Sequence, residues 1–371
     1  MMNLDVVELA KELIAIESET HHSNRPVADA IEATMHELGF TVERVVYDDG
    51  GVEKVNLVGK LGDGEGGLGL FGHADTVPGG AGWEPYAPVV KDSRLYGRGS
   101  CDMKGALAAM LVAASKVKPG QLRQPLVLAV TSDEETGHVG ARTIVTQSKL
   151  LAAGWPTYVV VGEPTELVPV YAHKGGCRID VTAHGVAAHT STDRGVSANF
   201  LIAPFLAEMA EVAQRFRREE RFMNFEFDPP TNGFNMVLDD GGCKPNVTAA
   251  RTVCTLSLRA MPGAHTEEAV ELIEARARAH GLEVESRSFN PFYVAPDADI
   301  VQAALRASGH TSAVTVPYGT EAVWYQAHAA TVVLGPGNIA QAHTVGEWIA
   351  LDQLHQAVAV YGRLVEELLE A

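Results

Sequence analysis

The stretch GLGLFGHAD, residues 67–75, decides the fold. It opens as a short apolar run that leads into polar residues, the pattern of a buried strand. The runs PLVLAVTS at 125–132 and YVVVG at 158–162 repeat this pattern, and the Ala-rich segment at 103–117 has helical character. Strand, helix and strand at this spacing predict an α/β fold with a largely parallel sheet covered by helices on both faces.

The flanking segments extend this α/β pattern. Residues 4–16 and 26–38 have helical spacing, and Gly39 suits the end of the second helix. Near the C-terminus the run TVVLGPG at 331–337 again has the character of a buried strand. We therefore expect the first part of the chain and its last part to build one domain.

The middle of the chain has a different pattern of apolar and polar residues. Its strand-like segments alternate apolar and polar residues, which is typical of strands with one buried and one free face. We expect a small α+β domain at 174–288, inserted into an α/β domain formed by 1–173 and 289–371. The expected order is strand 177–185, helix 198–216, strands 234–242 and 251–261, and helix 267–281.

Composition limits the classes of binding partner that the protein can have and indicates its location in the cell. The 371 residues include 29 Lys and Arg against 47 Asp and Glu, a formal charge of −18, which argues against binding to nucleic acid or an anionic membrane. No apolar stretch approaches the roughly 20 residues of a membrane span, and the N-terminal residues predict an amphipathic helix, not a signal peptide. The four cysteines form no paired motif, so we expect reduced thiols and a cytoplasmic location.

Metal-binding side chains follow the predicted strands at the points where the strands end. His73 follows the first run, and Glu135 and Glu163 follow the second and third. His343 follows the late run, and Asp102 precedes the Ala-rich helix. In open α/β sheets ligands bind outside the carboxyl ends of the strands. Two histidines and three carboxylates predict a zinc or cobalt site that uses no cysteine.

The number of predicted ligands favours two ions. Five ligands are more than one ion usually needs. They are too few for two ions, unless one carboxylate bridges both ions. A two-metal site holds its ions roughly 3.5–4 Å apart around a shared water or hydroxide. The charges also balance, because two Zn²⁺ ions would face three carboxylates and one bridging hydroxide.

Five short motifs surround these residues: HADTVP (73–78), GRGSCDMKG (97–105), DEETG (133–137), GEPT (162–165) and GVAAHTS (185–191). They resemble the signatures of M20-type dinuclear zinc amidohydrolases and peptidases, and the resemblance runs nearly end to end. Within that family, AHKGG (172–176), TEA (320–322) and GPGNIAQAHTVGEW (335–348) are most similar to acetylornithine deacetylases and their acetylcitrulline-deacetylating relatives. Succinyl-diaminopimelate desuccinylases are similar but differ around the last motif.

The resemblance implies a role for each predicted ligand. Asp102 would bridge two zinc ions, for which Co²⁺ can substitute, and a cis peptide would follow it at Asp102-Met103. Gly346 departs from the family, which commonly has an acid there, but it is not a ligand. The residues that would each bind one of the two ions are His73, Glu135, Glu163 and His343.

Two acidic residues beside the ligands have catalytic roles in this interpretation. An extended segment lets Asp75 lie behind His73 and fix its tautomer. An extended backbone would likewise point Glu134 and Glu135 apart, so that one binds metal while the other faces the substrate. The resemblance makes Glu134 the general base, which takes a proton from the bridging water and delivers it to the leaving amine.

The inserted domain carries candidates for substrate binding. The resemblance implies that His189 stabilises the developing oxyanion, Asn246 contacts the substrate and Arg259 binds its α-carboxylate, which suits the arginine fork. Without the resemblance, His189 could simply cap a turn and Arg259 could lie on a solvated face. Lys174 and Glu321 are further substrate-binding candidates, and an acid at 321 would suit the δ-ammonium of acetylornithine.

The expected activity is hydrolysis of a small N-acyl amino acid, with N²-acetyl-L-ornithine, in arginine biosynthesis, as the first candidate. Alternatives are a deacylase for acetylcitrulline, an acyl-lysine precursor or succinyl-diaminopimelate, and an M20-type dipeptidase or carboxypeptidase. Glu134 argues against a catalytically silent binding protein, which needs no base. A free sheet edge on the inserted domain favours a homodimer, in which the resemblance places His189 at the partner's active site.

Overall fold

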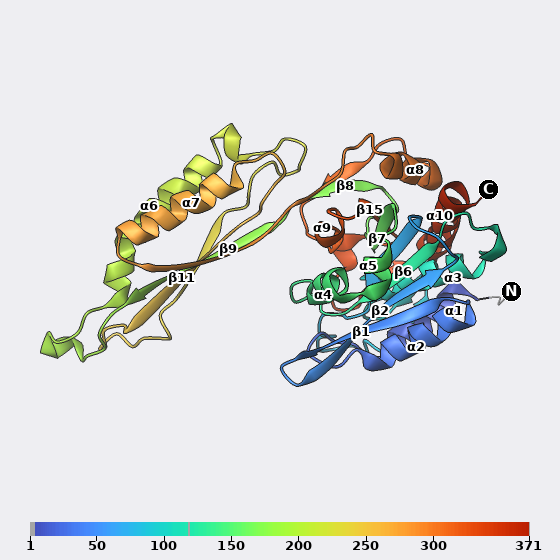
Figure 1. Ribbon diagram of the computed structural model, residues 1–371. Coiled ribbons are helices and arrows are strands. Elements are labelled where there is room, and N and C mark those ends of the chain that lie inside the picture. The colour runs from blue at the N-terminus through green and yellow to red at the C-terminus, as the bar shows by residue number, and fades with distance from the viewer. Residues whose placement is uncertain (1–3, 118, 371) are drawn as a thin grey trace. The chain divides into compact units, whose positions relative to one another are not determined.

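The computed structural model describes residues 4–117 and 119–370, which divide into two compact units (Figure 1). The first unit comprises the chain up to Tyr171, Val294–Val314, and the part from Thr320 onward. The second unit comprises Ala172–Tyr293 and Thr315–Gly319. Each unit has a hydrophobic core of its own.

Among the described residues, nine strands form one mixed sheet, in the order β1-β2-β6-β3-β7-β15-β8-β13, with β14 paired to β8. Its central strands β6, β3, β7 and β15 are parallel, and the flanking strands pair antiparallel. Every residue of β3 and β6 is buried, as expected for strands covered on both faces. The strands are β1 Thr41–Asp49, β2 Val52–Leu61, β3 Leu68–His73, β6 Leu126–Thr131, β7 Tyr158–Pro164, β8 Val170–His173, β13 Phe292–Tyr293, β14 Val314–Val316 and β15 Ala330–Gly335. A separate small sheet consists of β4 Val89–Lys91, β5 Arg94–Tyr96 and β16 Trp348–Ala350.

Helices cover both faces of the large sheet. α3 packs with α1 and α10 over one face, and α4 packs with α5 and α9 over the other. All twelve residues of α3 are buried, because the helix lies between the sheet and other helices. The helices are α1 Val6–Ala15, α2 Arg25–Glu37, α3 Lys104–Ser115, α4 Val139–Gln147, α5 Lys149–Ala153, α8 Asp299–Ser308, α9 Ala322–Tyr325 and α10 Leu351–Leu369, with short 3₁₀ helices at Pro119–Gln121 and Ile339–Gln341.

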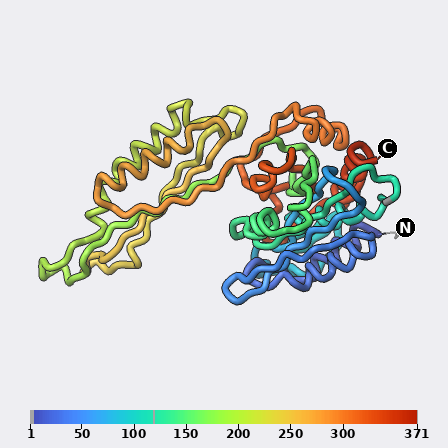
Figure 2. The backbone as a smooth tube through the Cα atoms, viewed as in Figure 1, coloured from blue at the N-terminus to red at the C-terminus, as the bar shows by residue number. Residues whose placement is uncertain are grey.

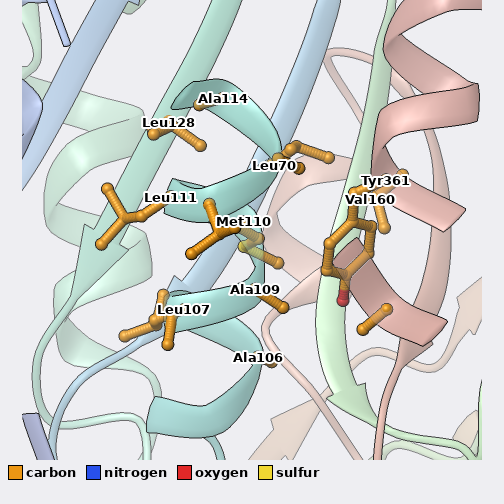
Figure 3. Close-up of a cluster of buried hydrophobic side chains, with 14 of the residues drawn as sticks. Leu70, Ala106, Leu107, Ala109, Met110, Leu111, Ala114, Leu128, Val160 and Tyr361 are labelled. Carbon is orange, nitrogen blue, oxygen red and sulfur yellow. The ribbon is translucent and has the colours of Figure 1, made fainter. Parts of the chain in front are cut away.

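Successive side chains of the central strands pack on opposite faces of the sheet. Leu70 of β3, Leu128 of β6 and Met110 of α3 belong to one buried cluster (Figure 3). The next residue along β3, Phe71, meets Tyr325 of α9 edge-on, with ring centroids 4.9 Å apart. This alternation follows from the two-residue period of a strand, and it gives the sheet a core on each side.

Two glycines let the start of α3 lie close to the strand ends. A Cβ on Gly72 would lie 2.2 Å from Met103 Cε, and a Cβ on Gly162 would lie 2.4 Å from Met110 Cε. A larger residue at either position would displace the end of a methionine side chain that packs against the strand. Because Asp102 directly precedes Met103, this close packing brings Asp102 to the ends of those strands.

The second unit is an antiparallel four-stranded sheet, in the order β10-β11-β9-β12, with α6 and α7 on one face (Figures 1 and 2). Ile179 and Val181 of β9 pack against Phe205 of α6 and Ile273 of α7. Charged and hydroxyl side chains line a shallow hollow on the other face. The elements are β9 Gly176–His184, β10 Asn235–Asp239, β11 Arg251–Leu258, β12 Glu283–Phe289, α6 Ala198–Phe216 and α7 Thr266–Ala279, with 3₁₀ helices at Thr190–Thr192 and Glu220–Phe222.

The predicted fold class is confirmed, with one strand added to the predicted order. β12 was not predicted, because EVESRSF is polar and six of its seven residues are exposed at the edge of the sheet. The second unit also includes Thr315–Gly319, outside the predicted range 174–288. None of the helices among residues 4–117 and 119–370 is long and apolar enough to cross a membrane.

Candidate metal centre

Three parallel strands bring ionisable side chains to one edge of the large sheet. β3 ends at His73, β7 carries Glu163 near its end, and the turn after β6 carries Glu135. His73 and Glu163 are only 1% and 5% exposed. The carboxyl ends of these strands lie together, which is where ligands bind in open α/β sheets.

Asp102 lies between two imidazoles. His73 Nε2 is 3.1 Å from Asp102 Oδ1, and His343 Nε2 is 3.2 Å from the other oxygen, Oδ2. His73 Nε2 is also 3.6 Å from Glu163 Oε1, and His343 Nε2 is 3.0 Å from Glu135 Oε2. The five residues therefore form two halves that share Asp102, as a bridging carboxylate would require. The peptide bond after Asp102 is cis.

The donor set fits divalent transition-metal ions. Ligand atoms of His73, Asp102 and Glu135 all lie within 4.8 Å of one another, and so do those of His73, Glu134 and Glu163. Imidazole and carboxylate donors suit zinc and cobalt. Carboxylates this close repel one another, and cations held between them would offset that repulsion.

Burial and close charged neighbours shift the pKa values of the predicted ligands. Burial disfavours a charged His73, yet hydrogen bonds with Asp102 and Asp75 raise its pKa well above the ordinary value. Hydrogen bonds with Asp102 and Glu135 raise the pKa of His343 to about 10. Burial raises the pKa of Glu135 to about 7. Acidic neighbours therefore raise the pKa of both imidazoles.

Asp75 contacts both His73 and the turn after β6. His73 Nδ1 lies 3.0 Å from the backbone carbonyl oxygen of Asp75 and 3.5 Å from its carboxylate Oδ1, so the expected carboxylate contact is the longer one. The carboxylate accepts hydrogen bonds from the backbone N–H groups of Glu134 and Glu135, at 3.2 and 3.3 Å. Asp75 thus links the orientation of His73 to the position of the two glutamates.

Glu134 and Glu135 lie in a turn, not in the extended backbone that we expected. Asp133 opens the turn with a φ of 55°, and the Gly137 N–H donates to the Glu134 carbonyl at 3.0 Å. The Asp133 carboxylate accepts hydrogen bonds from the buried Lys54 ammonium at 2.6 Å and from the Tyr47 hydroxyl at 2.7 Å. The two adjacent glutamates are therefore separated by turn geometry, not by strand alternation.

Glu134 lies beside the ligands, on the side of His73 and Glu163. Its side chain is 10% exposed, so it is sheltered but not sealed off. His138, four residues later, has its Nε2 3.2 Å from Glu134 Oε1. Burial acts to lower the pKa of His138, but the contact with Glu134 raises it above the ordinary value.

A buried glutamate holds the loop that carries Asp102. Glu347 is fully buried, and its Oε1 accepts hydrogen bonds from the backbone N–H groups of Cys101 and Asp102, at 2.8 and 3.0 Å. Its Oε2 accepts from the Gly99 N–H at 3.1 Å and from Arg98 Nη1 at 2.7 Å. Four donors from one loop thus converge on a single carboxylate.

His189 and Asn246 lie next to each other in the second unit. His189 forms an isolated β-bridge with Val247, and the Thr190 N–H donates to the Asn246 carbonyl at 3.0 Å. Both side chains are exposed. His189 Nδ1 accepts a hydrogen bond from the Ser191 backbone N–H at 3.3 Å, so this histidine does cap the short 3₁₀ helix that follows it.

Arg259 and Lys174 also belong to the second unit. Arg259 follows β11 and is exposed, whereas Lys174 is only 2% exposed. Lys174 Nζ donates to the carbonyl oxygens of Pro229 and Thr231, at 2.7 and 2.8 Å. Burial and the charge of Arg259 lower the pKa of Lys174.

Glu321 lies in the first unit and is fully buried. Its carboxylate accepts hydrogen bonds from Thr131 Oγ1 at 2.5 Å and from the Tyr325 hydroxyl at 3.2 Å. Burial and the nearby charge of Glu134 raise the pKa of Glu321 to about 7. An acid so placed can change its protonation state near neutral pH.

The sequence interpretation passed over three residues that support the site: Lys54, Asp133 and Glu347. Asp133 and Glu347 fall inside motifs already singled out, so their positions beside predicted ligands were an available signal. Lys54 lies in no such motif, and its partner Asp133 is 79 residues away. Pairing at that separation becomes visible only in the folded chain.

Comparison with known families matches residues 69–367 to the model of peptidase family M20/M25/M40. The chain belongs to this family. It is 35% identical over 369 residues to acetylornithine deacetylase from Myxococcus xanthus, with 95% of each chain covered. It is 32% identical to acetylornithine deacetylase from Proteus mirabilis, covering 97% of this chain and 96% of that one. Membership makes the protein a hydrolase of the M20 type.

Solved structures of this family share the fold. An M20 family metallo-carboxypeptidase from Sulfolobus solfataricus superposes with a TM-score of 0.77 at 15% identity, covering 98% of this chain and 99% of that one. Aminopeptidase PepT from Bacillus cereus superposes with a TM-score of 0.74 at 22% identity, covering 98% and 97%. A divalent metal centre is thus supported by both the family and the donor set.

Removing one acceptor from Glu347 should weaken metal binding. Glu347→Gln replaces one carboxylate oxygen with an NH₂ group, which cannot accept the hydrogen bonds that position Asp102. We expect metal affinity to fall about 10–100-fold, the usual effect of losing a partner that orients a ligand. Zinc titration measures this, with Glu366→Gln on the exposed face of α10 as the control. Unchanged affinity in a folded variant would contradict this role.

Metal binding should release protons. Metal ligands must be deprotonated, and acidic neighbours raise the pKa values of both His73 and His343 above the ordinary imidazole value. We expect the loading of zinc to release about two protons or more at pH 7, and metal affinity to rise with pH. Calorimetry in buffers of different ionisation enthalpy measures the number, and His343→Gln should release about one proton fewer. A binding enthalpy that does not depend on the buffer would refute the prediction.

Proposed function

We propose that this hydrolase removes the acyl group from a small N-acyl amino acid, with N²-acetyl-L-ornithine as the first candidate. The products would be acetate and L-ornithine, a step of arginine biosynthesis. The observation that carries the reaction type is the position of Glu134, a sheltered carboxylate beside a ready set of metal ligands. The substrate is supported by two relatives named acetylornithine deacetylase, which match nearly the whole chain.

We propose that the centre holds two Zn²⁺ ions, for which Co²⁺ can substitute. His73 and Glu163 would bind one ion, Glu135 and His343 the other, and Asp102 both, because the distances divide the ligands in this way. Bound zinc supplies an acidified water, with a pKa near 7, and polarises the acyl carbonyl.

Glu134 acts as the proton carrier in this proposal. Its carboxylate takes the proton from the attacking water and returns it to the nitrogen of the leaving amine. Asp75 supports both metal binding and proton transfer, because it orients His73 and holds the backbone of Glu134. Glu135 takes no part in the proton transfer, since its carboxylate faces His343.

The second unit would supply groups that recognise the substrate. Arg259 is exposed and offers a planar fork for an α-carboxylate. The adjacent His189 and Asn246 offer donors for the developing oxyanion and the acyl amide. Lys174, a second cation near Arg259, would add its positive charge to the attraction of the substrate carboxylate. Glu321 would attract the δ-ammonium of ornithine through its charge from a buried position.

Other substrates of the same class are the main alternative. Acetylcitrulline, an acyl-lysine precursor and succinyl-diaminopimelate all present an acylated amine and a carboxylate. The structural neighbours named as a carboxypeptidase and an aminopeptidase also support a peptide substrate. We further propose a cytoplasmic location, which fits four cysteines that are all free thiols.

We also propose a homodimer built on the second unit. The edge strand β10 is exposed along its whole length, with Val237 and Leu238 60% and 52% exposed. Phe200 of α6 is 83% exposed. An open strand edge with apolar side chains favours pairing with a second copy of the chain, and two-fold dimers are the commonest oligomers.

A small substrate panel tests the proposed activity. Purified protein with added Zn²⁺ or Co²⁺ should release acetate from N²-acetylornithine faster than it releases products from acetylcitrulline, succinyl-diaminopimelate or dipeptides. Faster cleavage of a dipeptide would favour the peptidase alternative. No turnover on any member of the panel, with metal bound, would overturn the proposed function.

Glu134→Gln should separate catalysis from metal binding. We expect both metals to stay bound, because Glu135 is the ligand, while turnover falls about 10²–10⁴-fold. Metal analysis and acetate release measure the two effects on one sample. Loss of zinc with a matching loss of activity would show that the roles of Glu134 and Glu135 are exchanged.

Mixed dimers test whether His189 acts on the partner's substrate. Co-expression of Glu134→Gln with His189→Ala gives heterodimers in which, if His189 acts across the interface, one site has both groups intact. We expect activity well above either parent, since an oxyanion donor contributes about 10²–10³ in rate. No recovery in confirmed heterodimers would contradict the arrangement.

A further inference from the structure

His138 lies at the end of the turn that carries Glu134. Its Nε2 is 3.2 Å from Glu134 Oε1, its side chain is 17% exposed, and α4 begins at the next residue. The His138 N–H also donates to the Glu134 carbonyl at 3.1 Å. Side chain and backbone of this histidine therefore both contact Glu134.

We propose that His138 is a positioning residue that holds the Glu134 carboxylate in its working orientation. The inference rests on the proposed role of Glu134 as the base. With Nε2 donating a hydrogen bond to Oε1, rotation of the Glu134 carboxylate is restricted. Its other oxygen, Oε2, then stays free to accept the proton of the attacking water.

The donor role holds in either protonation state of the ring. The protonated ring carries a hydrogen on Nε2, and so does the neutral tautomer that can bond to a carboxylate there. Among the described residues, no hydrogen-bond partner lies at the buried Nδ1. Glu134 is thus the partner that defines how this ring is placed.

The backbone of His138 indicates that its position is imposed by the surroundings. Its φ is 58°, in the left-handed region that side-chain-bearing residues rarely adopt. Such a residue persists only where neighbouring structure over-determines it. The turn bonds to Glu134 on one side, and the Arg142 N–H donates to the His138 carbonyl at 3.1 Å on the other.

Two substitutions of similar size separate the N–H donor from the shape of the ring. His138→Phe keeps a ring and removes the donor, whereas His138→Gln keeps an N–H near the place of Nε2. Both carry the same left-handed backbone, so strain is matched. We expect Phe to lower kcat about tenfold with KM and metal content unchanged, and Gln to restore most of kcat.

A similar His–Glu pair elsewhere gives the control. His36 on α2 lies four residues after Glu32, with Nε2 3.7 Å from Oε1, and its side chain is exposed. His36→Phe should leave kcat unchanged. If His138→Phe keeps wild-type kcat, or if Phe and Gln lose the same amount, the proposal is overturned.

A double-mutant cycle tests whether His138 acts through Glu134. In a Glu134→Gln background the residual turnover should not fall further on His138→Phe, because the positioned group is already inactive. Another tenfold loss in that background would show that His138 acts by some other route, and the proposal would fail.

Nitrogen NMR of the histidine rings gives a readout that does not depend on activity. We expect His138 Nε2 to carry its hydrogen in the wild type, and its shift to change on Glu134→Gln. A neutral ring with the hydrogen on Nδ1 would overturn the positioning role. If no acyl amino acid is hydrolysed but the NMR contact is present, the proposed function fails while the pairing of His138 with Glu134 stands.

Discussion

The hydrogen bonds of the buried Glu347 carboxylate are the interaction on which the centre depends most. Glu347 gathers three backbone N–H groups and one guanidinium from the loop that ends at Asp102. A carboxylate buried this fully is costly unless each oxygen is hydrogen-bonded. The same bonds that satisfy Glu347 therefore fix the residue that stands between His73 and His343.

The other proposed ligands are held in place by the sheet and by one turn. His73 and Glu163 come from strands whose residues are buried on both faces, so their positions follow from the core itself. Glu135 is held more indirectly: Asp75 binds its backbone, and the buried pair of Asp133 and Lys54 anchors the start of the turn. Breaking such a buried pair costs far more than replacing it whole.

Local pattern was enough to predict most of the elements and the sheet edge where the proposed ligands gather, but not the contacts between distant segments. The apolar runs ending near His73 and Glu163 identified both the parallel strands and the edge where chemistry gathers. The edge strand β12 was not predicted, because its polar sequence has no strand pattern of its own. It forms a strand by pairing with β9. Glu347 lies in a motif that the sequence singles out, but its contact with Asp102 spans 245 residues of chain and becomes visible only in the folded protein.

Zinc-edge anomalous diffraction from crystals grown with excess Zn²⁺ tests the central claim most directly. The proposed dinuclear centre predicts two peaks about 3.5–4 Å apart, one beside His73 and Glu163 and the other beside Glu135 and His343, with Asp102 contacting both. A single fully occupied peak, or two peaks that do not share Asp102, would contradict a dinuclear centre bridged by this residue.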